Sequence, residues 1–308
     1  MLKPDEMAFR YVFAVINPVA GGGRGHRAWS GIRSVLRATG VDLAEVLVER
    51  PGQAEEVAAR AAGQGYDLVV SVGGDGTIHE VLNGILLGRP ERPPVLAVIP
   101  GGTGNIFARG LGIPRDPAAA AGLLFHGVRK RVDVGRVNDR YFASVASVGF
   151  DAEIAYRAAR WPRWIDGFAR HIGAGLRALA DYRAVQARVT IDGRTQTVPL
   201  FFLAAANTVW YGAGIRIAPH ARADDGELAI VYGMDLTKAE VVGVLLRTFS
   251  GSHLSRPKMG HASAREVHVE SDVPMPVQAD GEPLGRVSAT FRCIPGMLEV
   301  LVPRPEPD

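Results

Sequence analysis

Three glycine-rich segments are the first part of this sequence that could carry chemistry. They lie at residues 17–25 (NPVAGGGRG), 73–77 (GGDGT) and 101–105 (GGTGN). Each follows a short apolar run that is typical of a buried strand and precedes a stretch with helical spacing. Glycine lets the backbone approach a ligand closely, and the exposed amides at a helix start attract phosphate. One such loop is usually only a tight turn, whereas three on successive strands indicate a phosphate-binding site.

The common nucleotide and catalytic motifs are absent from the chain. None of the loops ends in the Gly-Lys-Ser/Thr of a P-loop, and His26 stands where a dinucleotide fingerprint counted from Gly21 needs its third glycine. The eight histidines show no metal-ligand spacing, and no G-x-S-x-G elbow is present. The three loops therefore predict a phosphate-binding architecture of another kind.

Carboxylates stand in or beside several turns. Asp75 lies inside the second glycine loop, where an aspartate with a purely structural role would cap the helix that follows. The Asp-Gly pairs at 192–193 and 280–281 are typical of β-hairpin turns, and the second is followed by Glu282. Residues 224–227 form another acidic turn, of a kind that is usually only solvated. Taken alone, these turns leave structural and functional roles open.

The order of the elements predicts how the loops are brought together. Through about residue 125, strand-like runs alternate with helical stretches, which predicts a parallel sheet covered by helices on both faces. In such a sheet the loops gather at the carboxyl edge of the strands, where ligands bind. After about residue 130, strand-like runs follow one another with helices near 152–181 and 237–250. We expect two domains, residues 1–130 and 131–308, with the second built mainly from antiparallel strands.

Composition excludes several classes of protein. Hydrophobic residues make up 47% of the chain and charged residues 22%, so a sizeable core can form and wholesale disorder is excluded. The single cysteine, Cys293, rules out an internal disulfide framework and lies in an apolar run that favours the core. The first residues lack the basic and then apolar run of a signal peptide, and the apolar stretch at 200–206 is too short to span a membrane. These features predict a cytoplasmic protein.

Basic charge is concentrated in one segment. Residues 155–190 contain seven arginines against two aspartates, a local charge of +5 in a chain whose net charge is +3. Trp161, Arg163 and Trp164 combine the aromatic and basic side chains that favour a membrane surface with anionic headgroups. Nucleic acid is the weaker alternative, because no nucleic-acid-binding signature accompanies the charge. The structural alternative is that this segment is a helix that packs on the β domain with its arginines in solvent.

The motifs together resemble the diacylglycerol kinase catalytic family, which includes bacterial lipid kinases and the sphingosine and ceramide kinases. The resemblance runs in family order through residues 17–21, 73–84, 102–109, 131–135, 219–226 and 280–282. The extended GGDGT block is shared with NAD kinases, whereas the later Asp-Gly-Glu favours the lipid kinases. The resemblance implies an α/β N-terminal domain with a three-layer parallel sheet, of the NAD kinase and diacylglycerol kinase type, and a mainly antiparallel β-sandwich C-terminal domain.

The resemblance also implies an activity and the residues that serve it. It implies transfer of the γ-phosphate of ATP to a hydroxyl of a lipid, such as diacylglycerol or a sphingoid or ceramide-like lipid, with Mg²⁺. Glu282 would be the general base, with Asp75 and Asp280 as further catalytic residues. The implied nucleotide-binding residues are Asn17, Pro18, Val19, Ala20, Gly21, Gly73, Gly74, Asp75, Gly76, Thr77, Glu80, Asn83, Gly102, Thr103, Gly104 and Asn105.

Two magnesium sites are implied in the same way. Asp75 and Asp133 would take part in a magnesium and water network beside the phosphates, which suffices because Mg²⁺ keeps several waters and takes few protein ligands. A second, structural Mg²⁺ would be held by the Asp225 carboxylate and by backbone oxygens near Arg222 and Glu227.

Two departures from the family pattern keep the substrate and the activity open. Ile106 stands where many bacterial diacylglycerol kinases carry an aspartate, and residues 48–50 (VER) replace a threonine near the end of the second strand. A kinase of a soluble acceptor, similar to NAD kinase, is one alternative, and a nucleotide-binding regulator without turnover is another. Glu282 and Asp75 favour the enzyme. The expected partner is a lipid at the inner face of the membrane, reached by peripheral association, with no nucleic acid; a homodimer stays open.

Overall fold

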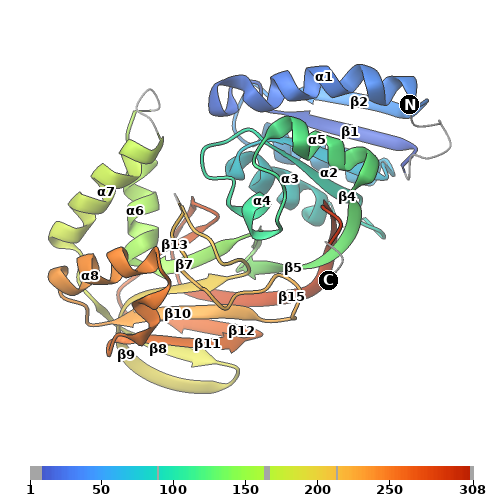
Figure 1. The fold of residues 1–308 in the computed structure, drawn as a ribbon. Helices are drawn as coiled ribbons and strands as arrows, with labels where there is room; N and C mark the ends of the chain where they lie inside the picture. Colours follow the sequence, from blue (N-terminus) through green and yellow to red (C-terminus); the bar gives the residue numbers. More distant parts are fainter. Residues whose placement is uncertain (1–8, 89, 163–166, 213, 306–308) are drawn as a thin grey trace. The chain divides into compact units, whose positions relative to one another are not determined.

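The computed structural model describes residues 9–88, 90–162, 167–212 and 214–305 (Figure 1). The chain folds into two compact units. Unit 1 comprises Met1–Val132 and Gly296–Asp308, and unit 2 comprises Asp133–Pro295. The chain therefore returns to unit 1 at its C-terminal end, which a single division into 1–130 and 131–308 does not include.

Unit 1 is built on a parallel sheet in the order β2-β1-β3-β4, to which the end of β15 adds at Val300 beside Leu96. Its strands are β1 (Tyr11–Ile16), β2 (Asp42–Leu47), β3 (Leu68–Gly73), β4 (Val95–Pro100) and the last part of β15 (Ala289–Val302). Every residue of β3 and β4 is buried, because helices cover both faces, so these strands are continuous apolar runs.

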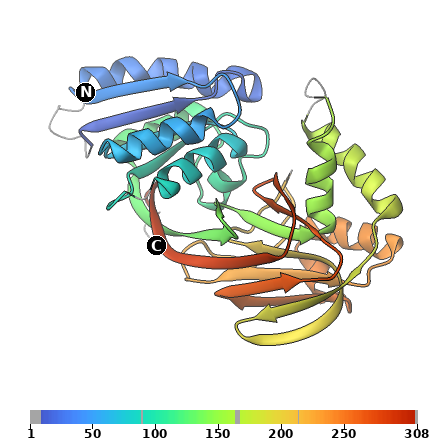
Figure 2. The same cartoon turned by 180° about the vertical axis from the view of Figure 1, so that it is seen from behind.

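The helices of unit 1 lie on the two faces of this sheet (Figures 1 and 2). They are α1 (Arg24–Ala38), α2 (Gln53–Gly63), α3 (Asp75–Leu87), α4 (Ile106–Gly110) and α5 (Pro117–His126), with a short 3₁₀ turn, η2 (Ala20–Gly23), before α1. Helix α1 packs with α5, and α2 packs with α3. The strand order reverses direction between β1 and β3, which is the point where ligands bind in open α/β sheets.

Unit 2 is a mainly antiparallel β domain, so the predicted fold class is confirmed. Its strands are β5 (Val128–Val137, which enters from unit 1), β6 (Arg140–Phe142), β7 (Val145–Gly149), β8 (Val185–Ile191), β9 (Arg194–Ala206), β10 (Leu228–Met234), β11 (Met259–Ala264), β12 (Glu266–Glu270), β13 (Pro276–Ala279), β14 (Glu282–Arg286) and β15. The main path runs β14-β13-β7-β9-β8-β12-β15, and β10 pairs with β9 and β11. Cys293 is buried in this core, and burial raises the pKa of its thiol to about 12, as expected of a core residue.

The helices of unit 2 differ from the prediction in one respect. The single helix expected near 152–181 is two helices, α6 (Phe150–Ala158) and α7 (Gly167–Asp181), which pack against each other. The third helix, α8 (Lys238–Thr248), is followed by the 3₁₀ turn η3 (Ser252–Ser255). Among the described residues, the structure contains no helix with the length and apolar character needed to cross a membrane.

Both Asp-Gly pairs form hairpin turns, as predicted. Residues 192 and 193 have φ of 43° and 82°, and residues 280 and 281 have φ of 48° and 92°. Positive φ at both central residues is what the two-residue hairpin requires, and aspartate and glycine adopt it at low cost. The turns join Ile191 to Arg194 and Ala279 to Glu282.

Candidate active site

The three glycine loops of unit 1 contact one another through their backbones. A Cβ atom on Gly21 would lie 1.8 Å from the carbonyl oxygen of Gly101, and one on Gly102 would lie 2.7 Å from the Cα of Gly74. The amide of Gly101 donates to the carbonyl of Gly73 at 2.7 Å. Side chains at these positions would push the loops apart, so the glycines are required by the packing. The structure thus brings the three loops together at the carboxyl ends of β1, β3 and β4.

The first loop has a conformation that favours glycine throughout. Gly21, Gly22 and Gly23 have φ of 53°, 72° and 76°, in the left-handed region. A Cβ on Gly22 would meet no atom within 4 Å, so the space beside it is open. Successive amides in such a conformation form a concave site for an anion.

Arg24 joins the first loop to the third and was not among the residues that the sequence singled out. Its Nε donates to the carbonyl of Gly21 and its Nη2 to the carbonyl of Gly102, both at 3.2 Å. The guanidinium therefore adds positive charge to the loops. The available signal was its position, directly after three glycines and at the start of a helix.

Asn17 and Thr77 tie the first loop to α3. The Asn17 Nδ2 donates to the Thr77 hydroxyl at 3.2 Å, and its Oδ1 accepts from the amide of Val19 at 3.2 Å. Thr77 is buried, whereas Val19 and Thr103 are exposed on the loops. The remaining loop positions predicted to bind nucleotide, Pro18, Ala20, Gly76 and Gly104, lie in the same three segments.

Asp75 links the second loop to the third. Its Oδ1 accepts hydrogen bonds from the amides of Ile106, at 2.6 Å, and Phe107, at 3.4 Å. The carboxylate thus caps α4, 31 residues further along the chain. A purely structural aspartate was expected to cap α3, the helix that directly follows it. Asn105 closes the third loop, since its side chain accepts from the Gly102 amide at 3.0 Å and donates to the Gly102 carbonyl at 2.9 Å.

Glu80 and Asn83 make contacts away from the loops. The Glu80 carboxylate accepts from the amides of Gly52, at 2.9 Å, and Ala54, at 3.1 Å, and so caps the start of α2. Asn83 is fully buried and donates to the carbonyl of His79 at 2.9 Å. These side chains hold α2 and α3 in place, and any effect on a nucleotide would pass through that packing.

The residues present in unit 1 fit the phosphates of a nucleotide. The glycine loops offer backbone amides with open space beside Gly22, and Arg24 contributes positive charge. Asp75 is the carboxylate in the second loop, and one or two carboxylates suffice for a Mg²⁺ that is also bound to phosphates. A separate hollow of about 1730 Å³, lined by residues that precede the strands such as Arg10, Asp67 and Pro94, contains none of the predicted nucleotide-binding residues.

In unit 2, Asp133 shapes the acidic turn at 222–227. The Asp133 side chain is buried, and its Oδ2 accepts from the amide of Gly226 at 2.7 Å. Its amide donates to the carbonyl of Ala223 at 2.7 Å, and its carbonyl accepts from the Asn207 side chain at 2.8 Å. Asn207 is fully buried. It was not predicted from the sequence, because a lone asparagine at the end of a strand belongs to no recognisable motif.

The turn is exposed at Arg222, Asp224 and Asp225. The Asp225 Oδ1 accepts from the amide of Glu227 at 3.1 Å, and Arg222 pairs with Asp224 at 3.4 Å. Among the described residues, no three His, Cys, Asp or Glu side chains form a group that could hold a metal. The second magnesium site would depend on backbone oxygens, and it stays a prediction.

Asp280 anchors the hairpin turn that carries Glu282. Its carboxylate accepts from three successive amides at the start of β7, those of Ala143, Ser144 and Val145, at 2.8, 2.9 and 3.2 Å. Glu282, the first residue of β14, is exposed to solvent. The fixed position of the turn and the exposed carboxylate beside it suit a base that meets a substrate from outside.

A buried polar chain supports the same turn from below. The Gln278 Oε1 accepts from the amide of Gly281 and its Nε2 donates to the Ser147 hydroxyl, both at 2.7 Å. Gln278 and Ser147 are fully buried. Neither was singled out from the sequence; the available signal was a glutamine inside the apolar run that leads into the turn. Their role is to position the turn and not to react.

We expect Asp280→Ala to lower the free energy of unfolding by at least about 3 kcal/mol, because three buried amides would lose a charged acceptor. Asp280→Asn keeps one carbonyl oxygen as an acceptor, so its free energy of unfolding should lie between those of Asp280→Ala and the wild type. Urea unfolding measures both. A loss below 0.5 kcal/mol, the usual size for a surface change, would show that the carboxylate does not anchor the turn.

Asp151, at the start of α6, lies beyond Ser147. The residue as a whole is half-buried, but its Oδ1 is out of contact with water and has no hydrogen-bond partner in the described part of the chain. Burial raises the pKa of Asp151 to about 6, although hydrogen bonds from Ser147 and from backbone amides favour the charged form. Burial and the nearby charges of Asp151 and Asp280 also raise the pKa of Tyr211.

The raised pKa of Asp151 predicts a pH effect on stability. Its ordinary value is 3.8, so between about pH 4 and pH 6 the folded chain holds this proton more tightly than the unfolded chain does. Stability contributed by this group therefore falls as the pH rises, by about 3 kcal/mol in all at roughly 1.4 kcal/mol per pKa unit, of which about 2 kcal/mol is lost between pH 4.5 and 7.5. Asp151→Asn should remove this loss. Urea unfolding at pH 4.5 and 7.5 tests it, and a variant with the same pH slope as the wild type would contradict it.

Of the predicted docking residues, only Trp161 lies within the described part of the chain; Arg163 and Trp164 lie outside it. Trp161 is half-buried, and its indole ring lies over Gly173 of α7, where a Cβ atom would be 2.5 Å from the ring. The ring therefore packs on α7.

Family profiles match both parts of the chain. That of the diacylglycerol kinase catalytic domain matches residues 11–137, and that of the YegS C-terminal NAD kinase beta sandwich-like domain matches residues 144–302. These matches cover the glycine loops and the Asp-Gly-Glu turn, respectively.

Whole-length relatives show the same similarity. The chain is 33% identical over 300 residues to a diacylglycerol kinase of Mycobacterium tuberculosis, covering 95% of each. It is 31% identical over 293 residues to a diacylglycerol kinase of Staphylococcus saprophyticus, covering 94% of each. A crystal structure of a candidate diacylglycerol kinase from Bacillus anthracis superposes with a TM-score of 0.80 at 25% identity, covering 96% of this chain and 98% of that one.

Proposed function

This chain belongs to the diacylglycerol kinase family and is an ATP-dependent lipid kinase, and we propose that it phosphorylates a lipid hydroxyl with Mg²⁺ and with Glu282 as the general base. The observation that supports the proposal is the backbone contact of Gly21 with Gly101 and of Gly74 with Gly102, which brings the three loops together and would let them form a phosphate cradle. Phosphoryl transfer depends mainly on positioning and on charge stabilisation, which such a cradle supplies.

The nucleotide would be held by unit 1. Backbone amides of the first and second loops, together with Thr103 in the third, would donate to the phosphate oxygens of ATP. Arg24 would add charge at the junction of the first and third loops, because its guanidinium already joins them. Glu80 and Asn83 would support the loops through α2 and α3.

Mg²⁺ would be bound by ATP and by Asp75 of unit 1, and the part of Asp133 in the magnesium and water network stays a prediction from the family resemblance. When bound, the ion neutralises charge on the phosphates. Asp75 already accepts two amides through Oδ1, so the orientation of its carboxylate is set by the protein. At position 106 this chain has isoleucine where many bacterial diacylglycerol kinases carry an aspartate. The Ile106 side chain is apolar and buried, and its backbone amide donates to the Asp75 carboxylate.

Glu282 would accept the proton of the substrate hydroxyl. Its exposed position lets an acceptor approach, and the turn beside it is held by Asp280 and Gln278. A base held near the attacking oxygen contributes about 10²- to 10⁴-fold to a rate. The acceptor is proposed to be diacylglycerol, which the relatives from Mycobacterium and Staphylococcus are named for, with a sphingoid or ceramide-like lipid as the alternative that Ile106 keeps open. The enzyme would reach it by peripheral association with the membrane.

The test uses purified full-length protein, ATP labelled at the γ-phosphate, Mg²⁺ and mixed micelles. Separate reactions contain diacylglycerol, phosphatidylglycerol, sphingosine, ceramide or monoacylglycerol, and one contains NAD as a soluble acceptor. We expect the label to enter one of these lipids, and we propose that this lipid is diacylglycerol. Label in NAD alone would replace the proposal with a kinase of a soluble acceptor, and ATP binding without transfer to any acceptor would indicate a regulator. Omission of Mg²⁺ should abolish transfer.

A further inference from the structure

Helix α7 exposes two of its large apolar side chains, Ile172 and Leu176, whereas a third, Leu179, packs against the unit 2 core. Its buried residues are the small Ala174 and Ala178, which allow close packing on α6. On the opposite side, Ile172 is 50% exposed and Leu176 is 68% exposed. An amphipathic helix of a globular protein normally buries its large apolar residues, so the exposure of these two side chains calls for an explanation.

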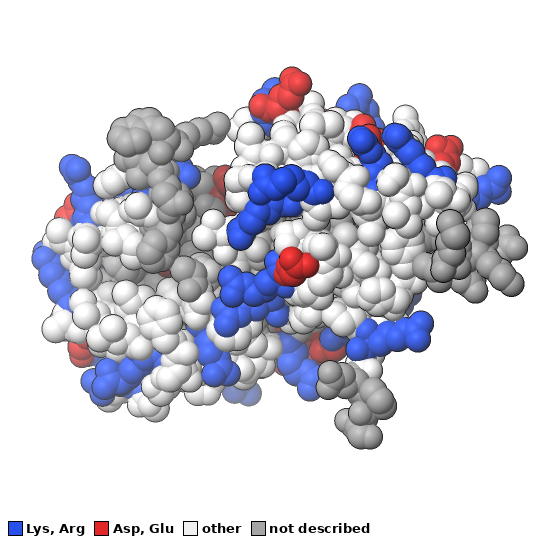
Figure 3. Space-filling view, turned by 45° about the horizontal axis from the view of Figure 1, so that its top comes forward, with Lys and Arg blue, Asp and Glu red and all other residues white. Residues whose placement is uncertain are grey.

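Helix α8 has a second apolar face that is exposed. Val241 and Val244 are buried against the unit 2 core, as expected. The neighbouring arc of the helix consists of apolar residues at the i, i+3, i+4 and i+7 spacing of a single face, and these are exposed by 46% to 67%: Val242, Leu245, Leu246 and Phe249. We call these four residues, with Ile172 and Leu176, the α7–α8 apolar band. In the space-filling view, the white surface on the left, on the side where α6–α8 lie in Figure 1, is largely uncharged, with basic and some acidic side chains at its margin (Figure 3).

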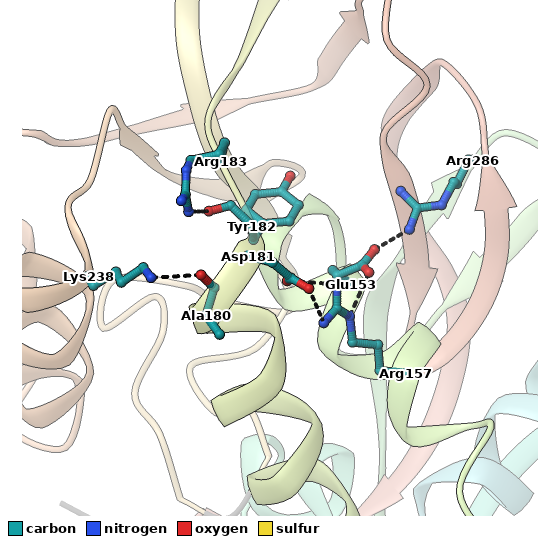
Figure 4. A network of polar contacts seen from close by, with 8 residues as sticks. All are labelled: Glu153, Arg157, Ala180, Asp181, Tyr182, Arg183, Lys238 and Arg286. Atoms are coloured by element: carbon teal, nitrogen blue, oxygen red, sulfur yellow. Dashed lines mark hydrogen bonds and ion pairs between the residues drawn. The ribbon is translucent and has the colours of Figure 1, made fainter.

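Polar contacts hold the two helices in place next to each other (Figure 4). The Lys238 ammonium, at the start of α8, donates to the carbonyl of Ala180 near the end of α7 at 2.7 Å. Arg157 of α6 pairs with Asp181 of α7 at 2.9 Å and with Glu153 at 2.7 Å. Glu153 is buried and also pairs with Arg286 of β14. The band is therefore presented on an ordered support.

The charges beside the band are mainly positive. Arg177, Arg183, Lys238 and Arg247 are exposed on or next to the two helices. The acids there are already paired, Asp181 with Arg157 and Glu240 with Lys258. Residues 167–183 and 237–250 together contain five Lys and Arg against two Asp and Glu, a net charge of +3. Apolar side chains flanked by cations suit the surface of a bilayer that contains anionic lipid.

We propose that the α7–α8 apolar band docks the enzyme on a bilayer that carries anionic phospholipid. This inference rests on the proposed lipid kinase function, since a substrate that resides in a bilayer has to be reached there. It places the contact on α7, which lies within the basic segment 155–190 that the sequence indicated, and on α8, which lies outside that segment. A second copy of the chain fits the band less well, because a symmetric pairing would bring the cationic margins against each other.

The test is co-sedimentation of the full chain with vesicles of phosphatidylglycerol and phosphatidylcholine, and with phosphatidylcholine alone. Leu246→Glu/Phe249→Glu places two charges on the band at exposed positions, so the fold should be kept. Val35→Glu is the matched control, since Val35 is 49% exposed on α1 of unit 1. We expect the double variant to bind the anionic vesicles at least tenfold more weakly, and the control to bind like the wild type.

Activity separates this inference from the proposed function. The double variant should lose at least tenfold of its rate on diacylglycerol in vesicles and retain its rate on a short-chain, water-soluble diacylglycerol. Equal vesicle binding by the variant and the wild type would overturn the docking surface. The docking surface would also be overturned if light scattering showed that the wild type is a dimer and that the double variant is a monomer with unchanged vesicle binding. Failure of the wild type to phosphorylate any lipid, even the soluble one, would instead overturn the proposed function, and vesicle binding would still report on the band.

Discussion

Glu282→Gln is expected to lower kcat for lipid phosphorylation by at least about 10²-fold with little change in the KM for ATP. The amide cannot accept the proton of the substrate hydroxyl, whereas its shape matches that of the glutamate. Glu282 is exposed and begins β14 after a turn held by Asp280, so the substitution should leave the melting temperature unchanged. Steady-state kinetics with the lipid identified in the micelle assay measure the effect.

The second Asp-Gly hairpin provides a control for this experiment. Arg194 occupies the place of Glu282 after the turn at 192–193 and is exposed as well. Arg194→Gln should therefore have wild-type activity. A Glu282→Gln enzyme that retains more than about a tenth of the wild-type kcat would exclude Glu282 as the general base, because a base of this kind contributes at least about 10²-fold.

Gly21→Ala is expected to abolish ATP binding, or to weaken it by at least tenfold, and to destabilise unit 1. The new Cβ atom would lie 1.8 Å from the Gly101 carbonyl oxygen, so the first and third loops would have to separate. Their separation would also break the contacts of Arg24, which joins the carbonyls of Gly21 and Gly102. Calorimetric titration with ATP and urea unfolding measure the two consequences.

Gly40→Ala separates this steric effect from the cost of the backbone conformation. Gly21 and Gly40 both have positive φ, so each alanine variant loses about 1–2 kcal/mol from the left-handed conformation alone. A Cβ on Gly40 meets no atom within 4 Å, and Gly40 lies between α1 and β2, outside the three glycine loops, so this variant should keep most of its ATP affinity. Equal losses in the two variants would contradict the role of loop contact in the phosphate cradle.

The elements that depend on local pattern could be predicted from the sequence. Alternating apolar runs and helical stretches predicted the parallel sheet of unit 1, and the two Asp-Gly pairs predicted hairpins that the structure contains. The prediction of a single helix near 152–181 was wrong, since α6 ends at Ala158 and α7 begins at Gly167. Apolar and basic residues have helical spacing on both sides of this break, and the prediction joined the two stretches. Glycine conformations and turns follow from interactions within a few residues, and a sequence pattern records those directly.

The partners of the site residues depend on segments that are far apart in the chain. Asp75 caps a helix 31 residues away, Glu80 caps a helix that precedes it, and Asp280 binds amides more than 130 residues earlier. The sequence determined which residue types stand in the glycine loops and after the Asp-Gly turn. Only the tertiary structure decided what each carboxylate binds and that α7 exposes Ile172 and Leu176. The reason is that hydrogen-bond partners and burial arise when distant segments pack together, and no local spacing encodes that packing.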